Sequence, residues 1–191
     1  MAATSGSNDP PIGESDTTGE KSSAWRIQPI PPGLINKPID YIFAEHNRQR
    51  DSTIILLMIA AGEFDKEGVT KLIEFFEVDF ALHIGDEEVA LFPLLRQHCL
   101  PEDKIDRILL RLQDEHRKDE ANVEDIIDAL KRCLAGEPIT SSTSLQLRLF
   151  ADHIHSHLAL ENGVVLPIAR VRLRGEELKV LTDMLKQRRS N

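Results

Sequence analysis

Residues 83–93 read HIGDEEVALFP, and residues 157–167 read HLALENGVVLP. Both stretches begin with a histidine, carry a glutamate four residues later and reach a proline ten residues after the histidine. Residues four apart lie on the same face of an α-helix, one turn from each other. Each stretch therefore predicts a helix that presents an imidazole and a carboxylate in one direction. The repeat also predicts a pseudo-symmetric pair of facing helices.

Apolar residues recur at helical spacing through nearly all of the chain after Gly33, and no alternating pattern suggests a strand. Pro93 and Pro167 are expected to interrupt or close their helices. Short connections favour antiparallel neighbours. The predicted fold class is therefore all-α, an antiparallel up-and-down four-helix bundle with a short C-terminal helix. The predicted helices cover residues 38–61, 66–90, 101–135, 143–167 and 176–188.

Two further histidines, His46 and His116, lie on the apolar stripes of the other two long helices. The stripe of the first helix is predicted from Ile39, Phe43, His46, Ile54 and Leu57, and that of the last long helix from Leu145, Leu149, His153, His157, Glu161 and Val165. A bundle core would thus receive four imidazoles and two carboxylates. The candidate metal ligands are His46, His83, Glu87, His116, His157 and Glu161.

A carboxylate that is buried without compensation costs several kcal/mol, and a bound cation offsets this cost. Six ligands exceed the four that a tetrahedral zinc ion takes. Two ions fit better, with His46 and His83 on one, His116 and His157 on the other, and the glutamates bridging them. Nitrogen and oxygen ligands without thiolate suit iron, manganese or zinc. Iron is preferred, because the shell leaves open positions for redox or dioxygen chemistry.

The chain resembles the haemerythrin-like, or HHE cation-binding, family over about residues 36–170. The resemblance rests on residues 40–50 (DYIFAEHNRQR), on residues 83–93, on Glu115-His116, on residues 153–157 (HIHSH) and on Glu161-Asn162. It implies an antiparallel four-helix bundle around a non-haem di-iron centre with an oxo or hydroxo bridge and carboxylate bridges.

Two departures separate the chain from the oxygen-carrying members. Those members place two histidines four apart on the third helix. Here the residues four positions before and after His116 are Leu112 and Glu120. The oxygen-carrying members also use His-x-x-x-x-Asp on the last helix, in place of His157-x-x-x-Glu161. Each iron would keep at least one open site. The chain therefore resembles the branch associated with nitric oxide, peroxide and iron–sulfur cluster stress, and the expected ligands are O2, NO or H2O2.

Composition narrows the class of protein and its partners. The chain has 191 residues, 41% of them hydrophobic, and a formal charge of −9, which argues against nucleic acid as a partner. No apolar run is long enough to span a membrane. No basic start with an apolar run marks a secretory signal, so we expect a cytoplasmic protein. The predicted organisation is a disordered tail (1–24), an extended arm (25–35), the bundle (36–170) and a C-terminal extension (171–191).

Several alternatives remain open at this stage. His153 is either an additional metal ligand or a hydrogen-bond donor to one of the ligands. Glu120 either orients His116 or reaches the metal itself. His98 and His155 are expected to be solvated, and Tyr41 is not assigned a catalytic role. A metal- or oxygen-sensing module, with the basic residues between Arg170 and Arg189 as a partner surface, is the alternative to ligand turnover. A structural zinc bundle is the third hypothesis.

Overall fold

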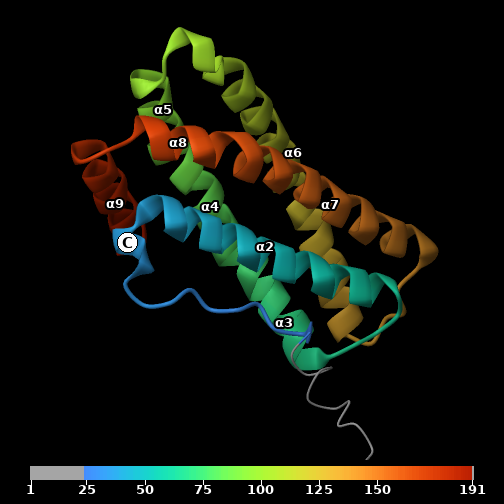
Figure 1. The fold of residues 1–191 in the computed structure, drawn as a ribbon. Helices are drawn as coiled ribbons and strands as arrows, with labels where there is room; N and C mark the ends of the chain where they lie inside the picture. Colours follow the sequence, from blue (N-terminus) through green and yellow to red (C-terminus); the bar gives the residue numbers. More distant parts are fainter. Residues whose placement is uncertain (1–23, 191) are drawn as a thin grey trace, which may run out of the picture.

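The computed structural model describes residues 24–190, which are helical almost throughout (Figure 1). No β-strand occurs within this range, so the prediction of an all-α chain is confirmed. The predicted N-terminal tail lies outside the described residues apart from Ala24. Within the same range, no helix combines the length and the apolar character that crossing a bilayer requires.

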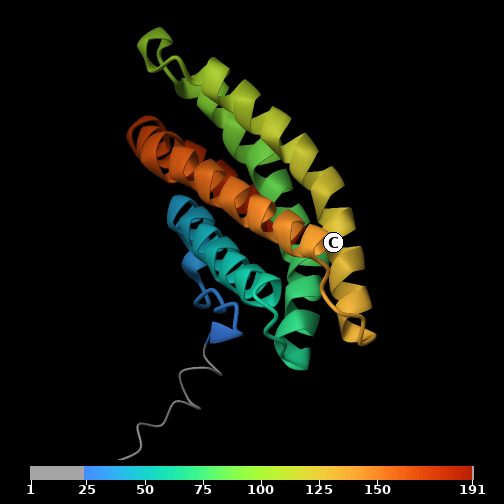
Figure 2. The same ribbon diagram turned by 90° about the vertical axis from the view of Figure 1, so that its right-hand side faces the viewer.

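The long helices pack side by side as a bundle. Helix α2 (Pro38–Ala60) lies along α7 (Ser141–Leu160), and α6 (Ile105–Leu134) contacts both α7 and α3 (Lys66–Glu74). Figure 2 shows α6 curving beside the helical segment that begins with α3. Capping residues fix two of the starts, because Asp65 accepts a hydrogen bond from the Gly68 amide and Thr140 accepts one from the Thr143 amide.

The repeated prolines do not end their helices, and the prediction that Pro93 and Pro167 interrupt or close them is wrong. The first segment runs from α3 through η2 (Phe75–Phe80), α4 (Ala81–Asp86) and η3 (Glu87–Leu91) into α5 (Phe92–His98). Likewise α7 continues through η5 (Glu161–Val165) into α8 (Leu166–Arg172).

The elements η3 and η5 are π-helical turns, and each proline is the second residue after its turn. Proline clashes with the carbonyl four residues earlier in a regular α-helix and cannot donate a hydrogen bond to it. The wider π turn changes that spacing locally, so the chain stays helical past the proline. Both π turns begin at a glutamate of the repeated pattern, Glu87 or Glu161.

The start of α6 also differs from the prediction. Residues Pro101–Asp103 form a separate 3-10 turn, η4, and Lys104 then adopts a left-handed backbone with φ 50°. The Asp103 carboxylate accepts a hydrogen bond from the Leu100 amide, and this bond stabilises the turn. The long helix therefore begins at Ile105 rather than at Pro101.

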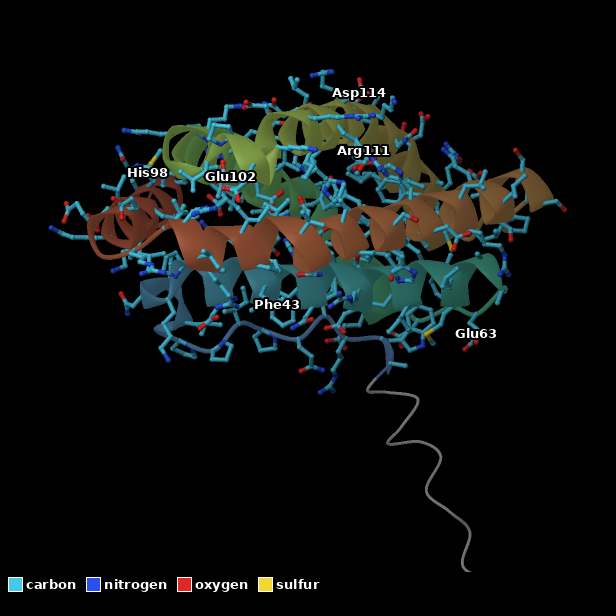
Figure 3. All side chains as sticks on the ribbon, turned by 45° about the horizontal axis from the view of Figure 1, so that its top comes forward. Phe43, Glu63, His98, Glu102, Arg111 and Asp114 are labelled. Atoms are coloured by element: carbon cyan, nitrogen blue, oxygen red, sulfur yellow. The ribbon has the colours of Figure 1, made fainter. Side chains whose placement is uncertain are left out.

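Two predicted apolar stripes are wrong in part. Phe43, on the outer side of α2 (Figure 3), is 40% exposed, and Ile54 is 48% exposed. On α7, Leu145 and Leu149 are exposed, and Leu147, Phe150 and Ile154 occupy the core face instead. Both helices carry apolar residues on more than one side, so spacing alone did not identify the buried side. The predicted burial of His46 and His157 is nevertheless correct.

The C-terminal helix α9 (Glu176–Arg188) packs against α2 and α4. Its end supplies two arginines to Asp86, which is 1% exposed: Arg188 Nε lies 3.1 Å from Asp86 Oδ1, and Arg189 Nη2 donates to Asp86 Oδ2 at 2.6 Å. Gly85 makes room for this contact, since a Cβ there would overlap the Arg188 guanidinium. Arg189 Nε also donates to the Tyr41 hydroxyl at 2.8 Å. These contacts fasten α9 to the two neighbouring helices.

Arg189→Ala is expected to lower the free energy of unfolding by about 3 kcal/mol, because it removes one of two charges that compensate the buried Asp86. Arg170→Ala is the matched control. Its ion pair with Asp40 is exposed, and its loss should cost less than about 1 kcal/mol. Urea denaturation of both variants measures the difference, and equal losses would contradict the role given to Arg189.

Candidate metal centre

The six predicted ligands lie together in the middle of the bundle. Each long helical segment contributes to them, and none of the six is more than 3% exposed. Each glutamate begins a π turn one turn after its histidine, and its carboxylate lies 3.5 Å (His83–Glu87) or 3.1 Å (His157–Glu161) from the Nε2 atom of that histidine. The contributors are His46 of α2, His83 and Glu87 of α4 and η3, His116 of α6, and His157 and Glu161 of α7 and η5.

The ligand atoms form two groups that share both carboxylates. One group contains His46, His83, Glu87 and Glu161, and the other contains His116, His157 and the same two glutamates. Within each group, the potential ligand atoms lie within 4.8 Å of one another. His46 Nε2 is 3.5 Å from a Glu87 oxygen and 3.4 Å from a Glu161 oxygen. His157 Nε2 is 3.1 Å from Glu161 Oε1, and His116 Nε2 is 3.4 Å from Glu87 Oε2.

Apolar side chains close the site above and below. One core cluster, which includes Phe76, Ile154 and Leu158, lies on one side along the bundle axis. A second cluster, which includes Ile42, Leu91 and Phe92, lies on the other side. The Phe92 ring stacks on the His116 imidazole with centroids 5.9 Å apart and planes inclined by 7°. The six polar side chains therefore lie between two apolar clusters.

Several of the inward-facing atoms have no hydrogen-bond partner among the described residues. They are His46 Nε2, His83 Nε2 and all four oxygens of Glu87 and Glu161. Buried polar atoms are normally satisfied, so this concentration of unpaired acceptors needs an explanation. Cations between the two histidine pairs would satisfy these atoms. The donor set of imidazoles and carboxylates fits metal ions such as iron, manganese or zinc.

Burial keeps His83 in the neutral form that metal binding requires, and it disfavours the ionised form of Glu161, an effect that a bound cation would reverse. It lowers the pKa of His83 to about 3, so this imidazole stays neutral and keeps a free lone pair. Burial and, next, the negative charge of Glu87 raise the pKa of Glu161 above its ordinary value. The charge of Glu87 thus opposes the ionisation of Glu161. Burial acts to raise the pKa of Glu87 as well, but His83, His116 and His46 lower it below its ordinary value.

In three histidines the outer ring nitrogen, Nδ1, lies within hydrogen-bond distance of a residue that the helical spacing did not identify. His116 Nδ1 lies 3.0 Å from Glu88 Oε1, and His157 Nδ1 lies 2.9 Å from Glu115 Oε2. His46 Nδ1 lies 2.8 Å from Asn162 Oδ1. An outer nitrogen that donates its proton leaves the lone pair of Nε2 directed at the carboxylates. A signal was present in the sequence: Glu88 and Asn162 are each the sixth residue of the repeated pattern.

Comparison with known proteins agrees with this geometry. The family model described as "Hemerythrin HHE cation binding domain" matches residues 37–169. The chain belongs to this haemerythrin-like family. A search of curated proteins found no match. All six candidate ligands lie within the matched range, whereas α9 lies beyond it.

The remaining histidines of this haemerythrin-like chain lie outside the two groups. His153 Nε2 is 2.9 Å from Asp119 Oδ1, a carboxylate that is 1% exposed, so His153 pairs with the protein and not with the ligand set. His155 is exposed and contacts the Thr53 hydroxyl, and His98 is half-buried beside Glu177. Glu120 is exposed, which contradicts the expectation that it orients His116 or reaches the metal. Glu88 occupies that outer position instead.

The basic residues near the C-terminus mostly bind within the chain. Arg170 pairs with Asp40, Arg172 with Asp103, and Arg188 and Arg189 with Asp86. Lys186 donates a hydrogen bond to Asn36. These contacts occupy most of the cations that the sequence offered as a partner surface, and they leave less charge free for such a contact.

Proposed function

We propose that this haemerythrin-like chain is a non-haem di-iron protein that binds or reacts with a small oxidant or diatomic ligand (O2, NO or H2O2) in the response to oxidative or nitrosative stress. The proposal includes an antiparallel four-helix bundle as the scaffold. Its main support is the pair of ligand groups that share Glu87 and Glu161.

Each group offers two imidazoles and one oxygen from each shared glutamate. His46 and His83 would hold one ion, His116 and His157 the other, and the glutamates would bridge them. Iron in a mixed imidazole and carboxylate shell commonly keeps open coordination positions. A bound iron pair would supply electrons to a small oxidant and a position at which that molecule docks.

The protein side chains have definable roles around such a pair. Glu88, Glu115 and Asn162 orient three of the imidazoles through their outer nitrogens. The two apolar clusters line the site on either side and would limit the entry of water. O2 and NO are small and nearly apolar and lose little solvation on entering such a site, H2O2 loses hydrogen bonds to water, and a charged substrate would lose much more.

Metal analysis and a visible spectrum of aerobically purified protein test the proposal. We expect two iron ions per chain, one for each ligand group, and a ligand-to-iron charge-transfer band in the near ultraviolet or visible. Addition of H2O2 to the oxidised protein, or of NO to the reduced protein, should then change that band.

A colourless protein that holds one zinc ion would refute the di-iron proposal and favour a structural zinc bundle. A di-iron protein whose spectrum responds to NO or O2, but which consumes neither these nor H2O2, would identify a sensing module without turnover. A di-iron spectrum that none of the three molecules changes would refute the proposed ligands.

A further inference from the structure

In each copy of the repeated sequence pattern, the sixth residue is a hydrogen-bond acceptor for the Nδ1 atom of a histidine on another helix. The two acceptors differ in charge. Glu88 follows Glu87 and binds His116 Nδ1, while Asn162 follows Glu161 and binds His46 Nδ1. The two residues occupy equivalent positions in the two stretches. One ligand group therefore has a carboxylate where the other has a neutral amide.

A second difference concerns the glutamates that precede the single histidines. Glu115 precedes His116 and binds His157 Nδ1, and Arg111 on α6 (Figure 3) holds its other oxygen at 2.8 Å. Glu45 precedes His46 in the same way, but it accepts hydrogen bonds from Tyr41 and Arg48. His83, the counterpart of His157 in the repeated pattern, has no hydrogen-bond partner for Nδ1 within residues 24–190.

The two differences act in the same direction. A carboxylate that accepts the outer N–H of an imidazole makes the ring a stronger electron donor to a metal. It also adds a negative charge near the cation, and a charge-assisted hydrogen bond is stronger than a neutral one. Both histidines of one group, His116 and His157, have such a carboxylate. His46 has only an amide oxygen, and His83 has no protein acceptor in the described chain.

We infer that the two metal positions are inequivalent. The position between His116 and His157 binds its ion more tightly, fills first and releases its ion last. The position between His46 and His83 is the exchangeable one. This inference rests on the proposed pair of metal ions, and it assigns the difference in affinity to Glu88 and Glu115 as positioning residues.

Release of cobalt(II) to excess EDTA tests this assignment, since cobalt accepts nitrogen and oxygen ligands and its visible bands report its coordination. We expect the wild-type protein to release two ions in two phases, one ion in each. Glu88→Gln and Glu115→Gln should each accelerate the slow phase by about 10- to 100-fold and leave the fast phase unchanged. Asn162→Asp should slow the fast phase.

Two matched controls make the same chemical changes elsewhere. Glu120→Gln lies one turn from His116 on the exposed side of α6, and Asn47→Asp is exposed and adjoins His46 in sequence. Neither should alter either phase. The melting temperature of each metal-free variant reports whether it is folded, and Asn162→Asp, which strengthens binding, cannot owe its effect to loss of structure.

The outcomes also separate the inference from the proposal beneath it. A wild-type protein that binds fewer than two cobalt ions would refute the paired site itself. Two ions released in a single phase would leave the paired site intact and overturn the inequivalence. Acceleration of the fast phase by Glu88→Gln or Glu115→Gln would overturn the assignment of the tighter position.

Discussion

Replacement of both Glu87 and Glu161 by glutamine is expected to abolish metal binding and yet stabilise the metal-free protein by roughly 1–4 kcal/mol. Both side chains are 0% exposed, and none of their oxygens has a hydrogen-bond partner in the described part of the chain. In the metal-free state they are two buried carboxylates that share one site. Glutamine keeps the shape of each side chain and removes its charge.

The neighbouring histidines help to accommodate this change. His46 Nε2 lies within 3.5 Å of both carboxylates, and the contacts with Glu87 and Glu161 raise its pKa despite burial, which lowers it. Without the two negative charges His46 can remain neutral, and a glutamine amide can donate a hydrogen bond to its ring nitrogen. The double variant thus replaces a buried cluster of coupled ionisable groups with neutral hydrogen-bonding groups.

Urea denaturation in the presence of a chelator measures the stability of the metal-free protein, and metal analysis measures binding. Glu120→Gln is the control, because an exposed glutamate should change stability by less than about 0.5 kcal/mol. A double variant that is less stable than the metal-free wild type would contradict the view that these carboxylates bind metal at a cost in the stability of the metal-free protein. With metal bound, the wild type should regain the advantage.

The ligand set illustrates what spacing can predict. His83 with Glu87, and His157 with Glu161, are recognisable because helical geometry alone places residues four apart on one face. Their convergence with His46 and His116 followed from four helices that each bury one face, and the structure brings all six together.

Other features required information from distant parts of the chain. The acceptors behind the histidines come from other helices: Glu115 of α6 reaches His157 of α7, and Asn162 of η5 reaches His46 of α2. Such contacts depend on which helices become neighbours. The continuation of the helices through Pro93 and Pro167 depends on π turns, which proline rules for regular helices do not include.

Among single substitutions, replacement of a candidate ligand histidine should lower the metal content by an amount that differs between the two groups. His83→Ala removes one imidazole from the group whose histidines have no carboxylate at Nδ1. This variant should retain the one ion held by His116 and His157. His157→Ala removes an imidazole from the other group and leaves Glu115 without its partner. It should therefore retain less than one ion per chain. The charge-transfer band of the iron pair should be lost in both variants.

His98→Ala and His155→Ala are the controls, since these histidines lie outside both ligand groups. They should keep the metal content and spectrum of the wild type. Metal analysis with a visible spectrum on all four variants, prepared in parallel, distinguishes the cases. Equal metal content in the four would refute the ligand assignment. Equal losses in His83→Ala and His157→Ala, with the controls intact, would keep the ligands but remove the difference between the two positions, because only an unequal donor set predicts that one variant retains an ion that the other loses.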